Sequence, residues 1–163
     1  QRKSESVKEI LPDLEILQKI SLERPKVEVY EGIEGFKTAV SKIIEKENQE
    51  IYCYIPEKIL HFLPTFHPQF RRKRRERNVR LKVITKKTKF MEEIKKADKE
   101  EFRETRFNNQ IMNNIDTAFY ILPDAVLILK ANEKEQLGVY IKEKGNSQLQ
   151  RQIFHNIWNE SLK

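Results

Sequence analysis

The sequence contains little of what several protein classes require. Its 163 residues include one cysteine, Cys53, which excludes an internal disulfide framework and fits a reducing cytoplasm. Its four glycines form neither a GxGxxG motif nor a P-loop, the usual backbone cradles for phosphate groups. No apolar run approaches the roughly 20 residues of a membrane span, and the charged N-terminal residues do not resemble a signal peptide. We therefore expect a cytoplasmic protein in which Cys53, within an apolar segment, has a packing role.

Histidine is also scarce, and its spacing indicates no catalytic or metal site. The three histidines are His61, His67 and His155. His61 and His67 are six residues apart, off one helical face, and no cysteine or carboxylate spacing completes a metal-binding pattern. We interpret them as isolated residues on helix surfaces, and we predict neither a metal ion nor a cofactor.

Charge, by contrast, is abundant and unevenly spread. Lys and Arg number 32 against 25 Asp and Glu, which gives a net charge of +7. Residues 57–99 hold 15 of the 32 basic residues but only 5 of the 25 acidic ones. A basic segment of this kind can meet nucleic acid, an anionic ligand or an acidic partner, or can simply be solvated.

The densest basic run lies at residues 71–77, directly after three phenylalanines that step by four residues. Phe62, Phe66 and Phe70 fall on one helical stripe, which Arg74 continues, while the other basic side chains point all round the helix. One interpretation is that these cations complement a helix C-terminus and cover apolar surface with their stems. The other is contact with an anion, an effector or a second subunit. The candidate residues for such a contact are Arg71, Arg72, Arg74 and Arg75. No aromatic residues interleave with the arginines, which argues against specific nucleic-acid binding.

Hydrophobic periodicity predicts strands and helices that alternate through most of the chain. The predicted strands are residues 26–31, 50–55, 79–85, 102–107, 116–122, 125–130 and 136–143. The predicted helices are residues 34–47, 57–78, 88–98 and 147–162. Pro64 and Pro68 should divide the second of these into two helices, and Gly145 with Asn146 should break the chain before the last. The inward faces of the last two helices are predicted to carry Phe90, Met91 and Ile94, and Leu149, Ile153, Ile157 and Trp158. This order predicts a mixed α/β sheet flanked by helices.

A further helix is predicted at residues 4–23, with Pro12 causing a kink or a start near Leu11. Its apolar residues form a narrow seam like that of a coiled coil. The seam consists of Val7, Ile10, Leu14 and Leu17. It either packs on its own domain or forms a contact between subunits, and we prefer dimerisation, because an isolated helix of this length is marginally stable. We therefore divide the chain into a linking helix, residues 1–24, and a domain of residues 25–163. The chain begins mid-helix, which suggests that a functional unit precedes it.

Four segments of the sequence resemble the sensor domain of TrmB-type prokaryotic transcription regulators. They are residues 26–32 with Gly35 following, 74–84, 119–128 and 137–141, in this order. The resemblance covers about residues 25–160. It implies a fold like half of a phospholipase D, pairing as a dimer, and a winged helix-turn-helix before the linking helix, which this sequence does not contain.

The same resemblance allows a test for catalysis. Phospholipase D-like enzymes carry His-x-Lys-x4-Asp, in which the histidine attacks phosphorus and the lysine holds phosphate oxygens. With Asp124 as the aspartate, Thr117 stands at the histidine position and Phe119 at the lysine position. Neither can perform that chemistry, so the resemblance implies the fold without the reaction. Candidate ligand-binding residues, at strand ends or at this centre, are Tyr30, Glu31, Tyr54, Glu57, Thr117, Phe119 and Asp124.

These observations predict a non-catalytic, effector-sensing and dimerisation domain of a DNA-binding transcription regulator. Its expected partners are a second copy of the chain, an unidentified small-molecule effector, and DNA through the winged helix-turn-helix; no membrane is expected. Two alternatives remain open: a basic nucleic-acid-binding module acting through residues 71–89, and a phospholipase D-like phosphodiesterase with a displaced nucleophile.

Overall fold

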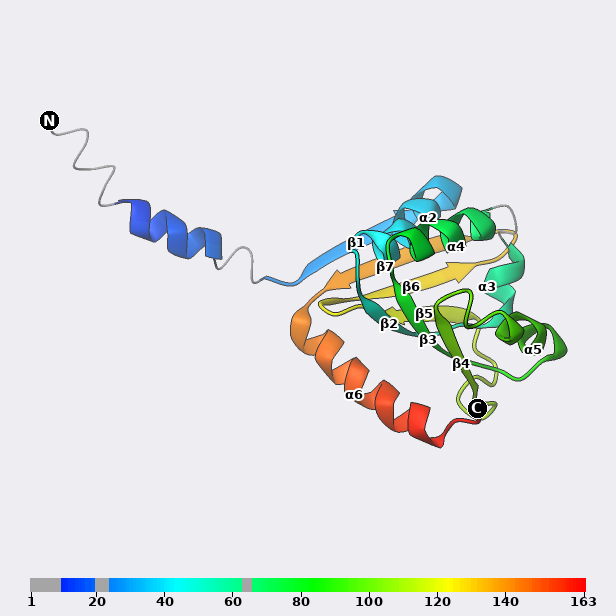
Figure 1. Ribbon diagram of the computed structural model, residues 1–163. Helices are drawn as coiled ribbons and strands as arrows, with labels where there is room; N and C mark the ends of the chain where they lie inside the picture. Colours follow the sequence, from blue (N-terminus) through cyan, green and yellow to red (C-terminus); the bar gives the residue numbers. More distant parts are fainter. Residues whose placement is uncertain (1–9, 20–23, 63–65) are drawn as a thin grey trace, which may run out of the picture.

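The computed structural model describes residues 10–19, 24–62 and 66–163, and its centre is one seven-stranded sheet (Figure 1). The strands are β1 (Lys26–Glu31), β2 (Glu50–Tyr54), β3 (Arg80–Thr85), β4 (Arg103–Phe107), β5 (Thr117–Ile121), β6 (Ala125–Ala131) and β7 (Gln136–Lys142). Their order across the sheet is β1-β7-β6-β5-β2-β3-β4. β2, β3 and β4 are parallel, and the remaining neighbours are antiparallel, so the predicted mixed sheet is confirmed.

Helices cover both faces of this sheet. They are α2 (Gly32–Ser41), the 3₁₀ turn η1 (Lys42–Ile44), α3 (Glu57–Phe62), α4 (Phe66–Glu76), α5 (Lys89–Lys96) and α6 (Lys144–Glu160). Figure 1 shows α2 and α4 on one face and α6 on the other. The division of residues 57–78 into two helices is confirmed, because α3 ends at Phe62 and α4 begins at Phe66.

Side-chain alternation along the strands builds two hydrophobic cores. On the face toward α2, Ile51, Leu127 and Leu129 belong to the larger core, with Phe36 of α2. On the face toward α6, Tyr52 and Ile121 join Phe154 and Trp158 of that helix. The ring of Phe154 stacks on Tyr52 with centroids 5.0 Å apart. Because successive residues of a strand point to opposite faces, the sheet separates the larger core under α2 from the aromatic core under α6.

Three sequence-based expectations about helices are wrong. The helix predicted at 34–47 ends earlier, since α2 stops at Ser41 and a 3₁₀ turn follows. Gly145 and Asn146 do not break the chain: the Glu143 side chain accepts hydrogen bonds from both of their backbone N–H groups, so they form the first turn of α6. In α5, Met91 is buried as predicted, but Phe90 is 39% exposed and lies beside the His61 ring.

The buried face of α6 also differs from the predicted one. Leu149 and Ile153 are 56% and 42% exposed, so their predicted inward placement is wrong. Trp158 is buried and Ile157 partly buried, as predicted, and Phe154, four residues before Trp158, is also buried against the sheet. The helix is therefore rotated toward its aromatic stripe, and the aromatic rings bury more apolar area than the aliphatic pair would.

Residues 10–19 form a helix with Pro12 in its first turn, where the missing N–H of proline costs no hydrogen bond. All ten residues are exposed. Ile10, Leu14 and Leu17 of the seam are 51%, 54% and 61% exposed. The rest of the predicted 4–23 helix, including Val7, lies outside the described residues.

Candidate functional site

Tyr54, Phe119 and Thr117 lie together on the α6 face of the sheet. Tyr54 of β2 is the direct cross-strand neighbour of Phe119 in β5, and their ring centroids are 6.5 Å apart. The Tyr54 ring also contacts Phe154 of α6 edge-on at 5.3 Å, and burial raises the pKa of Tyr54 to about 12. Thr117, two residues before Phe119, donates its hydroxyl hydrogen to Asp116 at 3.1 Å. This group is aromatic and neutral at its centre, and it presents no nucleophile activated by a neighbouring base.

Asp124 stands apart from this group, in the turn that joins β5 to β6. Its Oδ2 accepts a hydrogen bond from Nζ of Lys46 at 2.9 Å, which ties the turn to the segment after η1. Thr117 begins β5, whereas Asp124 follows the end of that strand. Asp124 therefore acts as a turn residue with a structural ion pair.

Tyr30 faces the opposite side of the sheet, at its β1 edge. Its hydroxyl donates to Oε2 of Glu28 at 2.5 Å, and Lys26 and Lys42 pair with the same carboxylate at 2.7 and 3.2 Å. Hydrogen bonds from Lys26 and Tyr30 lower the pKa of Glu28 to about 2. Glu31, next in sequence, is the N-cap residue of α2, but its side chain makes no capping hydrogen bond. Sequence reasoning missed Glu28, because Lys42 comes from η1 and meets Glu28 only in the folded chain.

Glu57 is the first residue of α3 and contacts Thr88, before α5, and His61 of its own helix. One oxygen accepts a hydrogen bond from the Thr88 hydroxyl, and the other lies 2.8 Å from Nε2 of His61. The Thr88 hydrogen bond is the main cause of a lowered pKa for Glu57, with His61 next. Of the seven candidate ligand residues, the fold thus gathers Tyr54, Thr117 and Phe119, and leaves Tyr30, Glu31, Glu57 and Asp124 at separate places.

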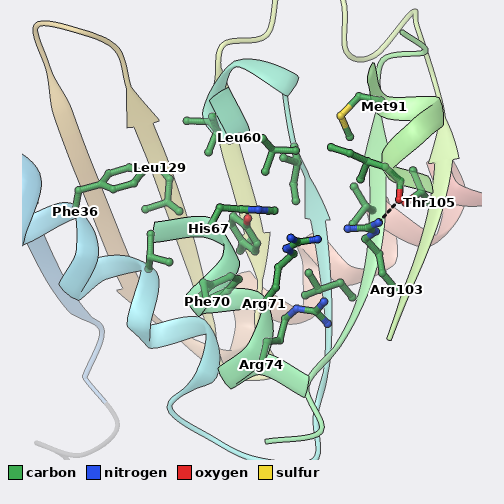
Figure 2. A pocket seen from close by; sticks show the side chains of 17 residues that line it. Phe36, Leu60, His67, Phe70, Arg71, Arg74, Met91, Arg103, Thr105 and Leu129 are labelled. Carbon is green, nitrogen blue, oxygen red and sulfur yellow. Dashed lines mark hydrogen bonds between the residues drawn. The ribbon is translucent and has the colours of Figure 1, made fainter. Parts of the chain in front are cut away.

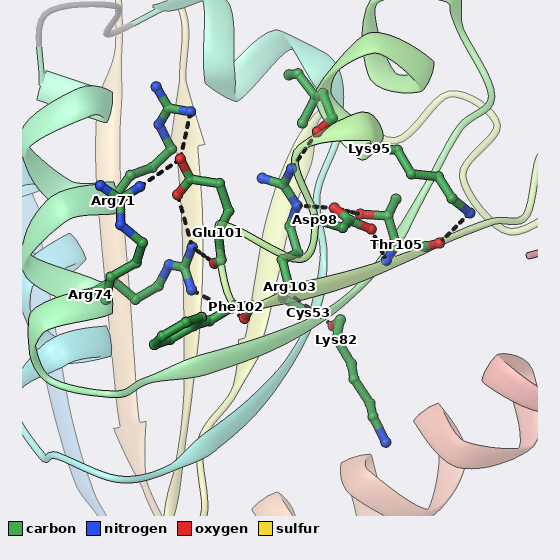
Figure 3. Close-up of polar contacts among 12 residues, drawn as sticks. Cys53, Arg71, Arg74, Lys82, Lys95, Asp98, Glu101, Phe102, Arg103 and Thr105 are labelled. Atoms are coloured by element: carbon green, nitrogen blue, oxygen red, sulfur yellow. Dashed lines mark hydrogen bonds and ion pairs between the residues drawn. The ribbon is translucent and has the colours of Figure 1, made fainter.

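The basic run gives a more compact arrangement, because one buried carboxylate holds three of the four candidate arginines (Figure 3). Glu101, only 7% exposed, accepts hydrogen bonds from Arg75 at 2.6 Å and Arg71 at 3.2 Å, and Arg74 Nη2 lies 3.6 Å from its second oxygen. Arg72 is excluded from this cluster and pairs with Glu76 on the exposed side of α4. Three guanidinium groups on one carboxylate leave an excess of two positive charges. Sequence reasoning missed Glu101, which comes from the turn before β4 and is 26 to 30 residues away from its partners.

Arg74 is the most deeply buried of these side chains, at 1% exposure. Its guanidinium donates to the carbonyl oxygens of Val79, at 2.9 Å, and Glu101, which ties the turn before β3 to the turn before β4. Burial, and then the charge of Arg103, lower the pKa of Arg74 to about 10. Of the predicted stripe of Phe62, Phe66, Phe70 and Arg74, the last two are buried on α4, whereas Phe62 belongs to α3.

One expectation about the histidines is wrong. His61 is exposed, as predicted, but His67 is half-buried rather than on the surface. Desolvation, followed by the charges of Arg71 and Arg103, lowers the pKa of His67 to about 4. The ring is therefore neutral at physiological pH.

The part of the chain that the structure describes contains neither a metal-binding cluster nor a membrane-spanning helix. No group of three or more His, Cys, Asp or Glu residues could hold a metal ion there. Within the same residues, no helix has the length and apolar character that crossing a membrane demands.

Comparison with known proteins finds similarity of fold rather than of sequence. No family model and no curated protein matches the chain. Among solved structures, TrmBL2, described as an archaeal chromatin protein with a novel mode of DNA binding, matches all of this chain and 67% of its own at 20% identity, with a TM-score of 0.56. NucT from Helicobacter pylori matches 85% of this chain and 99% of its own, with 10% identity and a TM-score of 0.63. Nuc from Salmonella typhimurium, a phospholipase D family member, matches 85% of this chain and 97% of its own, with 13% identity and a TM-score of 0.63.

The chain has the fold of a phospholipase D half. The resemblance to TrmB-type proteins and to the phospholipase D family is confirmed at the level of the fold. Sequence identities of 10–20% establish a shared fold and not a shared function.

Proposed function

We propose that this phospholipase D-like domain is a non-catalytic, effector-sensing and dimerisation domain of a cytoplasmic DNA-binding transcription regulator. Residues 1–24 act as the linking helix and residues 25–163 as the sensor domain. DNA is bound by a winged helix-turn-helix outside this sequence, and a small-molecule effector shifts the relation between two subunits.

The observation that carries the proposal is the pair Thr117 and Phe119. If the catalytic positions of the phospholipase D family align as the sequence suggests, these residues replace the nucleophile and the phosphate-holding lysine. Phe119 packs beside Tyr54, so the place of a cation is taken by an aromatic contact. A site without nucleophile and cation lacks both elements of that phosphoryl-transfer chemistry.

Two further observations support a regulatory role. This chain matches 67% of TrmBL2, so about a third of that protein has no counterpart here. A separate DNA-binding unit could occupy that remaining third. The helix at residues 10–19 exposes a seam of Ile10, Leu14 and Leu17, which suits contact with a second subunit.

Catalysis is tested with a generic phosphodiester, bis(p-nitrophenyl) phosphate, incubated with the purified chain. We expect no turnover above buffer. If turnover appears and persists in His61→Ala, His67→Ala and His155→Ala variants, the protein is an enzyme with a nucleophile other than histidine and the proposal is wrong.

DNA binding is tested by filter binding of the chain alone to duplex DNA at about 50 mM salt. The proposal expects no tight binding, because three of the arginines in the basic run are held by Glu101. Tight binding with a steep loss on adding salt would instead favour the basic nucleic-acid-binding module. The adjoining upstream coding sequence should encode a winged helix-turn-helix in the same reading frame.

A further inference from the structure

A small cavity of about 70 Å³ lies on the α2 face of the sheet, beneath α3, α4 and α5 (Figure 2). Most of its wall is apolar, with Val40, Leu60, Val83 and Met91 among the lining residues. This face is opposite to the one that carries Thr117 and Phe119, so the cavity is separate from the positions where phospholipase D-like chemistry would occur.

One side of the cavity is cationic. His67, Arg71 and Arg74 come from α4, and Arg103 comes from β4. Figure 2 shows the guanidinium group of Arg71 near the neutral imidazole of His67, whereas Arg103 donates from Nη2 to the carbonyl oxygen of Ile94 at 2.6 Å. Arg103 is neutralised by Asp98, whose Oδ1 lies 2.6 Å from its Nε. Arg71 and Arg74, by contrast, share Glu101 with Arg75 and account for the excess positive charge.

Hydrogen-bonding capacity is also left over at this wall. Arg74 is 1% exposed, and its Nε has no hydrogen-bond partner; the Nε of Arg71 is likewise buried without one. A buried donor without an acceptor costs about 1–3 kcal/mol, so an acceptor that enters the cavity would recover part of that cost. Both the charge and the unpaired donors therefore favour an anion at the α4 side.

We propose that this cavity binds a small carboxylate that carries a short apolar chain. The carboxylate accepts from the Nε–H groups of Arg71 and Arg74, the guanidinium donors that lack a partner. The chain lies among Val40, Leu60, Val83 and Met91, where it gains from apolar burial. At roughly 10–15 Å³ for each water-sized group, the cavity of about 70 Å³ holds about five to seven non-hydrogen atoms, which is the size of a carboxylate with a chain of about three carbons. This site stands on the cavity and its charges, and does not depend on a role in transcription.

The chain contains two methionines that make a direct test possible. Met91 lines the cavity, whereas Met112 is buried in the other core, on the α6 face. Protein labelled with ¹³C in the methionine methyl groups is titrated with sodium butyrate at constant ionic strength. We expect the Met91 methyl resonance to shift and saturate while the Met112 resonance stays in place. No shift of Met91 at 50 mM butyrate, or equal shifts of both, would overturn the proposal.

Related small molecules separate the charge from the chain. Butanol has the chain without the charge, and inorganic phosphate has charge without the chain. Each should shift Met91 at least ten-fold more weakly than butyrate does. If butanol matches butyrate, the site is merely apolar; if phosphate matches it, the cavity is a general anion site. Either result rejects an apolar carboxylate as the ligand class.

A matched pair of variants on α4 tests the cationic wall. Arg71→Gln removes a guanidinium that lines the cavity, and Arg72→Gln removes its exposed neighbour. Butyrate affinity should fall at least ten-fold in Arg71→Gln and change less than two-fold in Arg72→Gln. An unchanged Met112 resonance in both variants reports that the fold is intact. Equal affinity in both variants would contradict the proposal.

Discussion

Arg74 is the residue on which the α4–β3 junction depends. Its guanidinium satisfies backbone carbonyl groups in the turns before β3 and before β4, and approaches the Glu101 carboxylate. Arg74→Met keeps the apolar stem but leaves these buried acceptors unpaired, and we expect a loss of about 3 kcal/mol in the free energy of unfolding, measured by urea denaturation. Arg72→Met, two positions earlier and exposed, should stay within about 0.5 kcal/mol. A loss below about 1 kcal/mol in Arg74→Met would show that water replaces these bonds.

His67 should make stability depend on pH in a defined window. Its folded-state pKa of about 4 lies below the unfolded value near 6.5, because burial and Arg71, Arg74 and Arg103 disfavour the charged ring more than Glu101 favours it. The unfolded state therefore takes up the proton first, so stability is full above pH 6.5 and falls as the pH drops toward 4.

The measurement is the urea midpoint between pH 7 and pH 4.5. His67→Gln should lose this slope, whereas His155→Gln, at an exposed position, should keep it. The Glu28 contribution is distinct, since its pKa of about 2 places the corresponding loss below about pH 4.5. A wild-type slope that persists in His67→Gln would assign the effect to other groups.

At the scale of elements, α2 and β7 approach each other closely at Gly138 and Ala39. A Cβ added at Gly138 would lie 2.3 Å from the Cβ of Ala39, far inside van der Waals contact. Gly138→Ala should therefore destabilise the protein by about 2–3 kcal/mol in thermal or urea unfolding, since α2 must move away from the sheet.

Rescue by a second change distinguishes this clash from a general effect. Ala39→Gly removes the opposing methyl group, so the double variant should be more stable than the sum of the two single effects, even though glycine weakens the helix. Gly145→Ala is the control and should change little, because its added Cβ meets only the end of the Glu143 side chain, at 3.2 Å. Strict additivity would reject the close approach.

Periodicity predicted the elements well and their rotation less well. The strand at 26–31 and the two helices within 57–78 follow from local pattern and proline chemistry. The burial of Phe154 rather than Ile153 does not, because both residues continue an apolar stripe and only the partner ring of Tyr52 decides between them. The capping role of Glu143 was also missed. Glycine usually interrupts a helix, but here the Glu143 carboxylate accepts the backbone N–H of Gly145 and so holds it in the first turn of α6.

The candidate site was less predictable than the fold. From the sequence, Tyr54 and Phe119 could be brought together only by assuming the phospholipase D-like fold. In the structure they are direct cross-strand neighbours. Glu101 could not be found, because nothing local marks one glutamate among many as the buried partner of Arg71, Arg74 and Arg75. Long-range charge pairing is a property of the folded chain that local sequence windows do not contain.

For the whole molecule, the helix at residues 10–19 is the element that would join two subunits. At tens of micromolar, light scattering should give the mass of a dimer. Leu14→Glu with Leu17→Glu should return the monomer mass, since both replace exposed apolar side chains of the seam by charge. Ile16→Glu is the matched control: Ile16 is 56% exposed but lies on another face of the same helix. A monomer mass for the unmodified chain would count against the proposed dimer.

Cys53, completely buried in β2 and the single cysteine of the sequence, makes this chain convenient for spectroscopy. Burial raises the pKa of its thiol, so the native protein should not react with a maleimide or a disulfide reagent, whereas the protein unfolded in urea should expose one thiol. A cysteine introduced at Leu17 would then be the sole point of attachment for a spin label or fluorophore. Distances between two labelled chains could be measured without first removing a native residue from the core.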